Sequence, residues 1–186
     1  MKRNPFLPWL AASLLSLAPA IQAQTIEDEL RERVDSLRSA AAPTLLSHRV
    51  LTSGILIPMY EEAGFQPLWG DSAKVEELRS LVRDAEQHGM LPEDFFLYTL
   101  DRMPAPEAMG GAGQRADYDL LMTEALLRYL YNRRFGKVNP ESIDRNINFR
   151  REVRPGEPVH RTILGMIDDG GLAAEIDALT MHGPWY

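Results

Sequence analysis

The stretch Asp117-Tyr-Asp-Leu-Leu-Met-Thr-Glu-Ala-Leu-Leu-Arg-Tyr-Leu-Tyr-Asn-Arg-Arg-Phe-Gly-Lys-Val-Asn-Pro140 decides the fold class of this chain. Apolar side chains between Tyr118 and Phe135 cover most of a helix circumference, which is typical of a helix buried among other helices. Gly136 can adopt the left-handed conformation that ends a helix. The stretch therefore predicts a central core helix. Its polar stripe is formed by Asp117, Glu124, Arg128 and Asn132.

Helical periodicity recurs on both sides of this stretch. Thr25, with Asp28 three residues later, predicts a capped helix that we expect to be exposed and lightly packed. An apolar helix is expected over residues 45–63, with a kink at Pro58. Further helices are predicted at 72–85, from residue 92, at 158–167 and at 172–179. The inward residues expected in the 45–63 helix are Val50, Gly54, Ile57 and Tyr60.

The segments between these helices carry turn and loop signals. Pro67 favours an extended backbone at the residue before it, so the aromatic segment Phe65–Asp71 is expected to be an ordered connector. Residues 103–113 contain prolines and glycines with little periodicity, which predicts a mobile loop. No useful period-2 run and no Asn-Gly turn are present in the sequence. The prediction is an all-α fold in a single compact multi-helix domain.

The amino terminus has the pattern of a signal peptide. Lys2 and Arg3 precede an apolar run that ends near Ala18, and Ala20 and Ala23 are acceptable to a signal peptidase. A transmembrane anchor is the alternative, but the run is shorter than the ~20 apolar residues needed to span a membrane. Residues 1–23 are therefore expected to be removed on export, with no integral membrane segment left afterwards.

Composition limits the partners of the exported chain. The protein has no Cys, so its stability must come from the core and not from disulfides. Its net charge is −7, and loss of Lys2 and Arg3 with the signal peptide makes it more acidic. Such a charge disfavours nucleic acid and anionic lipid as partners and leaves the cell wall or another protein.

No catalytic constellation is recognisable in the sequence. The letters of a dinucleotide fingerprint at 111–116 follow a Pro/Gly loop and not a strand, and the four His are too scattered for a local metal motif. We therefore expect no cofactor and no metal. The acid pairs Glu61-Glu62, Glu76-Glu77 and Asp168-Asp169 keep a hydrolase open as an alternative, with Glu62 or Glu61 as the acid, although neighbouring carboxylates on a helix point apart.

Two groups of residues are candidates for binding or for structural roles. The first group is aromatic and proline-rich and surrounds the connector. The second group is basic and lies at the end of the central helix, where it suits either the carboxylates of a ligand or the negative end of the helix dipole. The candidates are Tyr60, Phe65, Pro67, Trp69, Arg128, Arg133, Arg134 and Lys137.

Three segments together resemble one family. They are Tyr60-Glu-Glu-Ala-Gly-Phe-Gln-Pro-Leu-Trp69, Ala85-Glu-Gln-His-Gly-Met-Leu-Pro-Glu-Asp-Phe95 and the stretch from Leu120 to Pro140. In this order they resemble the amino-terminal helical scaffold domain of the large periplasmic L,D-transpeptidases of Gram-negative bacteria. The resemblance covers roughly residues 45–182 and implies a periplasmic protein in peptidoglycan remodelling.

The same resemblance implies a catalytic domain with a nucleophilic Cys, which this chain does not supply. His182-Gly183 echoes part of the catalytic His-Gly-Cys neighbourhood of that family. We divide the chain into 1–23 (signal peptide), 24–44 (exposed helix and linker), 45–182 (scaffold-like domain) and 183–186 (truncated continuation). It is expected to be non-catalytic by itself, as a stand-alone scaffold, a truncated product or a separately encoded half. Its partner is then peptidoglycan or a cell-wall enzyme. The alternative function for the chain is that of a secreted helical peptidoglycan hydrolase or of an adaptor that binds peptidoglycan or protein.

Overall fold

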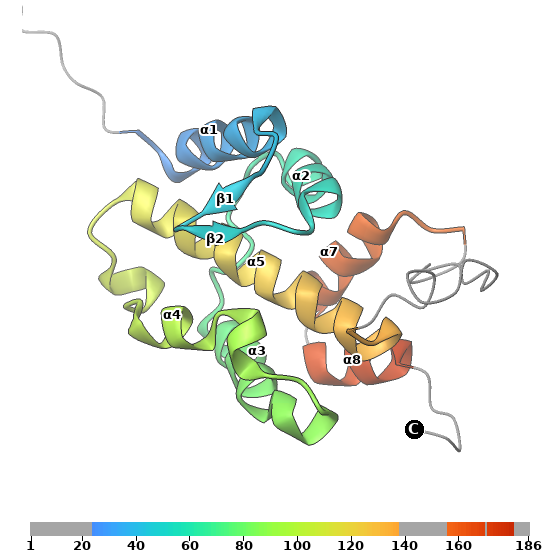
Figure 1. The fold of residues 1–186 in the computed structure, drawn as a ribbon. Coiled ribbons are helices and arrows are strands. Elements are labelled where there is room, and N and C mark those ends of the chain that lie inside the picture. Colours follow the sequence, from blue (N-terminus) through green and yellow to red (C-terminus); the bar gives the residue numbers. More distant parts are fainter. Residues whose placement is uncertain (1–23, 138–155, 170, 181–186) are drawn as a thin grey trace, which may run out of the picture.

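The computed structural model describes residues 24–137, 156–169 and 171–180. These residues form an all-α fold, as predicted, with one hairpin of two very short strands (Figure 1). The α-helices are α1 (Ile26–Ser39), α2 (Ser53–Glu62), α3 (Ser72–Arg83), α4 (Leu97–Arg102), α5 (Ala112–Phe135), α7 (Val159–Asp169) and α8 (Leu172–Leu179). The strands are β1 (Thr44–Leu45) and β2 (His48–Arg49), and the 3-10 helices are η1 (Asp84–His88), η2 (Pro92–Phe95) and η3 (Pro106–Ala108).

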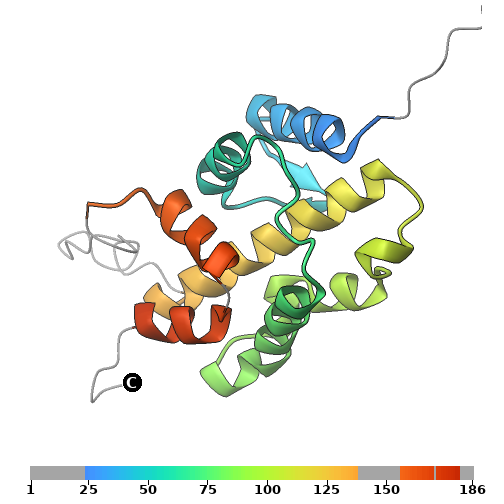
Figure 2. The ribbon, with the colours of Figure 1, turned by 180° about the vertical axis from the view of Figure 1, so that it is seen from behind.

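Helix α5 runs through the middle of the molecule, with the other elements around it (Figures 1 and 2). Every residue from Tyr118 to Leu127 is buried, which confirms the predicted core helix. The helix begins at Ala112, inside the segment expected to be a loop, and Pro106–Ala108 forms the short η3 helix. Gly111 precedes α5 in an extended conformation, so the fingerprint letters at 111–116 start a helix without a strand before them.

Helix α1 is capped as predicted but is not an exposed leader. The hydroxyl of Thr25 accepts the backbone N–H of Asp28, and the Asp28 carboxylate accepts the N–H of Thr25. Leu30, Val34 and Leu37 are buried where α1 packs on α5 and α2. The expectation was wrong because these three side chains form one apolar stripe, although the helix as a whole is strongly charged.

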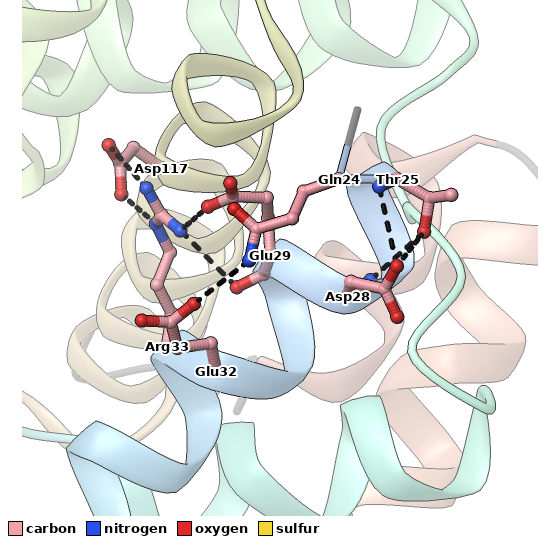
Figure 3. A network of polar contacts seen from close by, with 7 residues as sticks. All are labelled: Gln24, Thr25, Asp28, Glu29, Glu32, Arg33 and Asp117. Atoms are coloured by element: carbon pink, nitrogen blue, oxygen red, sulfur yellow. Dashed lines mark hydrogen bonds and ion pairs between the residues drawn. The ribbon is translucent and has the colours of Figure 1, made fainter. Parts of the chain in front are cut away.

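A polar contact fixes α1 against the start of α5 (Figure 3). Arg33 donates hydrogen bonds to Asp117 on α5 and to Glu29 one turn earlier on α1. A Cβ atom placed on Gly113 would lie 3.0 Å from Nη2 of Arg33. A side chain at Gly113 would therefore crowd the Arg33 and Glu29 side chains that form this contact.

The helix expected over residues 45–63 is wrong in its first half. Residues 44–49 form the β1–β2 hairpin, in which Leu45 pairs with His48. Leu46 and Ser47 turn the chain with φ angles of 48° and 68°, and neither residue is typical of such a turn. Helix α2 starts at Ser53. Of the expected inward residues Val50 and Tyr60 are buried, whereas Gly54 is exposed and Ile57 is half-buried.

The predicted connector is present, and so is a helical element that begins at residue 92. Gly64 and Phe65 both have positive φ angles after α2, and the chain then crosses to Asp71 without regular structure. The Asp71 carboxylate caps α3 by accepting the N–H of Ala73 at 2.8 Å. Gly89 takes the left-handed conformation after η1, and η2 begins at Pro92.

The end of α7 and the start of α8 are capped by side chains of α3. Lys74 of α3 donates to the carbonyl oxygens of Ile167 and Asp168 at the end of α7. Glu77 of α3 accepts the N–H of Ala173 at 3.0 Å, which replaces the side-chain cap that Gly171 cannot provide. These contacts connect the α7–α8 pair to the rest of the fold.

No helix among the described residues is long and apolar enough to cross a membrane. The expected signal peptide at 1–23, most of the polar segment after Pro140 and the last residues, 181–186, lie outside the described residues.

Candidate functional site

The first candidate site is a buried polar cluster around Asp119 of α5. Its carboxylate accepts the hydroxyl of Tyr60 at 2.6 Å and the backbone N–H groups of Leu68 and Trp69 at 3.0 Å each. The hydroxyl of Thr123, one turn later, accepts the indole N–H of Trp69 at 2.9 Å and lies 2.8 Å from the hydroxyl of Tyr60. Asp119 and Thr123 thus bind α2 and the connector to α5.

Burial dominates the electrostatics of this cluster. It raises the pKa of Asp119 above its ordinary value, although the hydrogen bonds from Tyr60 and from the connector backbone act in the opposite direction. Burial and the nearby Asp119 raise the pKa of Tyr60 well above its ordinary value. Because these side chains and Trp69 are enclosed, the cluster is a structural centre and offers no surface to a ligand.

A second polar cluster surrounds Glu124, which is 1% exposed. Its carboxylate accepts the N–H of Leu51 at 2.8 Å, the hydroxyl of Thr52 and Nε of Arg128 at 2.8 Å. The other two guanidinium nitrogens of Arg128 donate to the carbonyl oxygens of Arg49 and Asp94. The side chains of Glu124 and Arg128 are therefore both engaged by other parts of the protein.

A groove of about 590 Å³ opens beside this second cluster. Its walls come from the start of α2, from the carboxyl-terminal half of α5 and from η2. We call it the α2–α5 groove. Its lining residues are Leu51, Thr52, Gly54, Ile55, Asp94, Arg128, Tyr131, Asn132 and Lys137.

The basic candidates separate into different environments. Arg128 and Lys137 both line the α2–α5 groove, and Lys137 forms an exposed ion pair with Asp94 at 2.6 Å. Arg133 instead pairs with Asp177 of α8 at 3.0 Å. Arg134 donates to the carbonyl oxygen of Leu179. The structure thus brings together two of the four predicted cations.

The aromatic and proline candidates also lie in different parts of the structure. Tyr60 and Trp69 belong to the buried Asp119 cluster. Phe65 is half-buried, with the guanidinium of Arg31 4.6 Å from its ring centroid. Pro67 lines a cleft of about 520 Å³ between the connector and α7.

The same cleft contains the acid considered for a hydrolase. Glu62 and Asp168 both line it, so a second carboxylate is present. Glu62, however, pairs with Arg161 at 2.9 Å and with His160 at 3.0 Å, and its side chain is part-exposed, unlike the desolvated carboxyl expected of a general acid. Within the described ranges, no three His, Cys, Asp or Glu residues gather as metal ligands.

Sequence reasoning missed Asp119 and Thr123 and placed Glu124 only in the polar stripe. A signal for the first two was present, because they are polar residues four positions apart in an otherwise apolar helix and thus share one face. Their partners lie in α2 and the connector, which no local pattern relates to α5.

Comparison with known proteins identifies the family. The Scaffold domain family matches residues 55–186, which is most of the chain. The protein therefore belongs to the Scaffold domain family. No curated protein and no solved structure matches it.

Proposed function

We propose that this protein is a non-catalytic periplasmic scaffold module that acts with an L,D-transpeptidase catalytic domain in peptidoglycan remodelling. The observation that carries the proposal is the Scaffold domain match over 55–186, taken with the three segments that resemble the scaffold of L,D-transpeptidases. The signal-like residues 1–23 support export to the periplasm.

The chemistry of the chain supports a role without catalysis. L,D-transpeptidation in the resembled family needs a cysteine thiolate as nucleophile, and the sequence has no Cys. The polar residues buried in α5 are all engaged in joining helices, as a rigid support requires. In this proposal the module positions a catalytic partner or its substrate, and the partner supplies the nucleophile.

Two measurements test this proposal. The purified protein is first incubated with tetrapeptide-bearing muropeptides, and mass spectrometry is expected to detect no L,D-cross-linked dimers. A dimer signal that persists through further purification would refute the absence of catalysis. The protein is then mixed with a purified L,D-transpeptidase catalytic domain from the same cell. We expect the two to co-elute as a 1:1 complex in size-exclusion chromatography, and separate elution at high concentration would contradict a partner role.

A further inference from the structure

The α2–α5 groove has features of a small-molecule or peptide site. Its volume of about 590 Å³ lies within the usual range of ligand pockets, roughly 300–1,000 Å³. Leu51 is 61% exposed at its edge, and Ile55 and Tyr131 add apolar surface to its walls. Such an exposed apolar wall suits a small aliphatic group of a ligand.

The polar groups of the groove indicate what the ligand is. Within the described residues, the side-chain amide of Asn132 has no hydrogen-bond partner, so it can pair with both the N–H and the C=O of a peptide group. Lys137 holds Asp94 through an exposed ion pair, which is weak enough to be exchanged for a ligand carboxylate. The positive end of α2, whose first turn has no acidic residue, also borders the groove.

Arg128 does not take part directly, because all its nitrogens are used by Glu124, Arg49 and Asp94. Its role is to hold η2 and the end of β2 in place beside the groove. Among the described residues, the groups of the groove that remain for recognition are the Asn132 amide, the exchangeable Lys137, the amino-terminal end of α2 and the apolar wall.

We propose that the α2–α5 groove binds a short extended peptide with small side chains and a free carboxylate, and that in the cell this ligand is the stem peptide of peptidoglycan. The choice of stem peptide rests on the proposed function. A protein partner is disfavoured for the groove itself, because a stable protein interface buries roughly 1,200–2,000 Å² and a groove of this size accommodates only a few residues.

Gly54 allows the groove to be tested without damage to the fold. It lines the groove, it is exposed, and a Cβ atom at this position meets nothing within 4 Å. Gly54→Ala removes a flexible residue from a helix, and Gly54→Glu adds a negative charge that the amino-terminal end of α2 tolerates. Gly54→Gln has the size of Glu without its charge.

The probe is the soluble disaccharide-tetrapeptide, titrated into the purified protein by calorimetry. We expect saturable binding to the unchanged protein and to Gly54→Ala, and no detectable binding to Gly54→Glu. Gly54→Gln should bind more weakly than Gly54→Ala but better than Gly54→Glu. Lys137→Ala, or a probe with amidated carboxylates, should weaken binding roughly tenfold through loss of one charge-assisted contact.

Leu91→Ala is the control for a substitution outside the groove, because Leu91 is 58% exposed and does not line it. It should bind the probe as the unchanged protein does. Absent binding, or equal binding by Gly54→Glu, overturns the inference. The inference is also overturned if Gly54→Glu prevents binding of the catalytic domain but leaves binding of the tetrapeptide probe unchanged, because the occupant of the groove is then a protein. Complex formation with the catalytic domain without tetrapeptide binding would leave the proposed function standing, so the two failures are distinguishable.

Discussion

The hydroxyl of Tyr60 donates a 2.6 Å hydrogen bond to the carboxylate of Asp119 in the centre of the protein. This contact joins α2 to α5 at the point where the connector also donates two backbone N–H groups to the same carboxylate. A buried carboxylate is tolerable only when its oxygens are hydrogen-bonded. The centre of this fold therefore depends on a few polar contacts as well as on apolar packing.

Removal of the Tyr60 hydroxyl tests that dependence. Tyr60→Phe keeps the ring but takes one donor from Asp119, and we expect a loss of about 1.5–3 kcal/mol in the free energy of unfolding. Urea unfolding measures the loss. Tyr98→Phe is the control, because Tyr98 is 63% exposed and its change should be close to zero. Equal effects at the two positions would contradict a special role for the Tyr60–Asp119 contact.

Trp69 provides a larger test of the connector. The indole of Trp69 is buried and bonded to Thr123, so the connector packs on the central helix. Trp69→Ala removes a large buried side chain and should cost about 3–5 kcal/mol, a large share of a typical stability of about 5–15 kcal/mol. We expect an aggregated or partly unfolded variant at 37 °C by circular dichroism. A variant that melts with the parent would refute the structural role of Trp69.

Because Glu77 caps α8, its removal is expected to destabilise α8 more than the rest of the protein. Glu77→Ala leaves the N–H of Ala173 without its partner and should cost about 0.5–2 kcal/mol, the usual value of a helix cap. Hydrogen exchange should accelerate most in α8. Glu76→Ala is the matched control, since Glu76 pairs with Arg83 on the surface. Faster exchange in α8 with the control variant as well would show that the cap is not the cause.

The surroundings of Asp101 predict that the free energy of unfolding depends on pH. Burial alone would raise its pKa, but the hydrogen bond from Arg79 and the charge of Arg83 outweigh burial and lower the pKa below its ordinary value of 3.8. The folded state therefore binds this proton less tightly than the unfolded state does. The stabilisation is present above pH 3.8 and is lost as the pH falls through the lowered pKa.

The measurement for Asp101 is the difference in free energy of unfolding between the protein and Asp101→Asn at several pH values. We expect the protein to be more stable than the variant at neutral pH and the difference to shrink below about pH 4. A difference that widens as the pH falls would mean that the pKa of Asp101 is raised and not lowered.

The sequence predicted the elements whose signal is local. Apolar coverage from Tyr118 to Phe135 was enough to identify the core helix, and Thr25 marked the start of α1. The β1–β2 hairpin was missed because Leu46 and Ser47 lack the Asn-Gly or Asp-Gly signal of a two-residue turn, although both have positive φ angles. The burial of α1 was missed because an apolar stripe does not reveal which surface covers it.

The candidate site was less predictable than the fold. Arg128 and Lys137 were identified as cations, but only the fold places them with Asn132 and Leu51 around one groove. Gly54 was expected to face inward and instead lies at the surface of that groove. A groove formed by α2, η2 and α5 depends on long-range contacts, and helical periodicity describes each helix separately.

The yield of L,D-cross-linked muropeptide dimers tests the central claim most directly. A purified L,D-transpeptidase catalytic domain from the same cell is assayed with tetrapeptide muropeptides, with and without increasing amounts of this protein. We expect no dimers from this protein alone and a saturable rise in the yield of the catalytic domain when it is added. A yield that stays unchanged across the titration, or dimers formed by this protein alone, would contradict its role as a non-catalytic scaffold module.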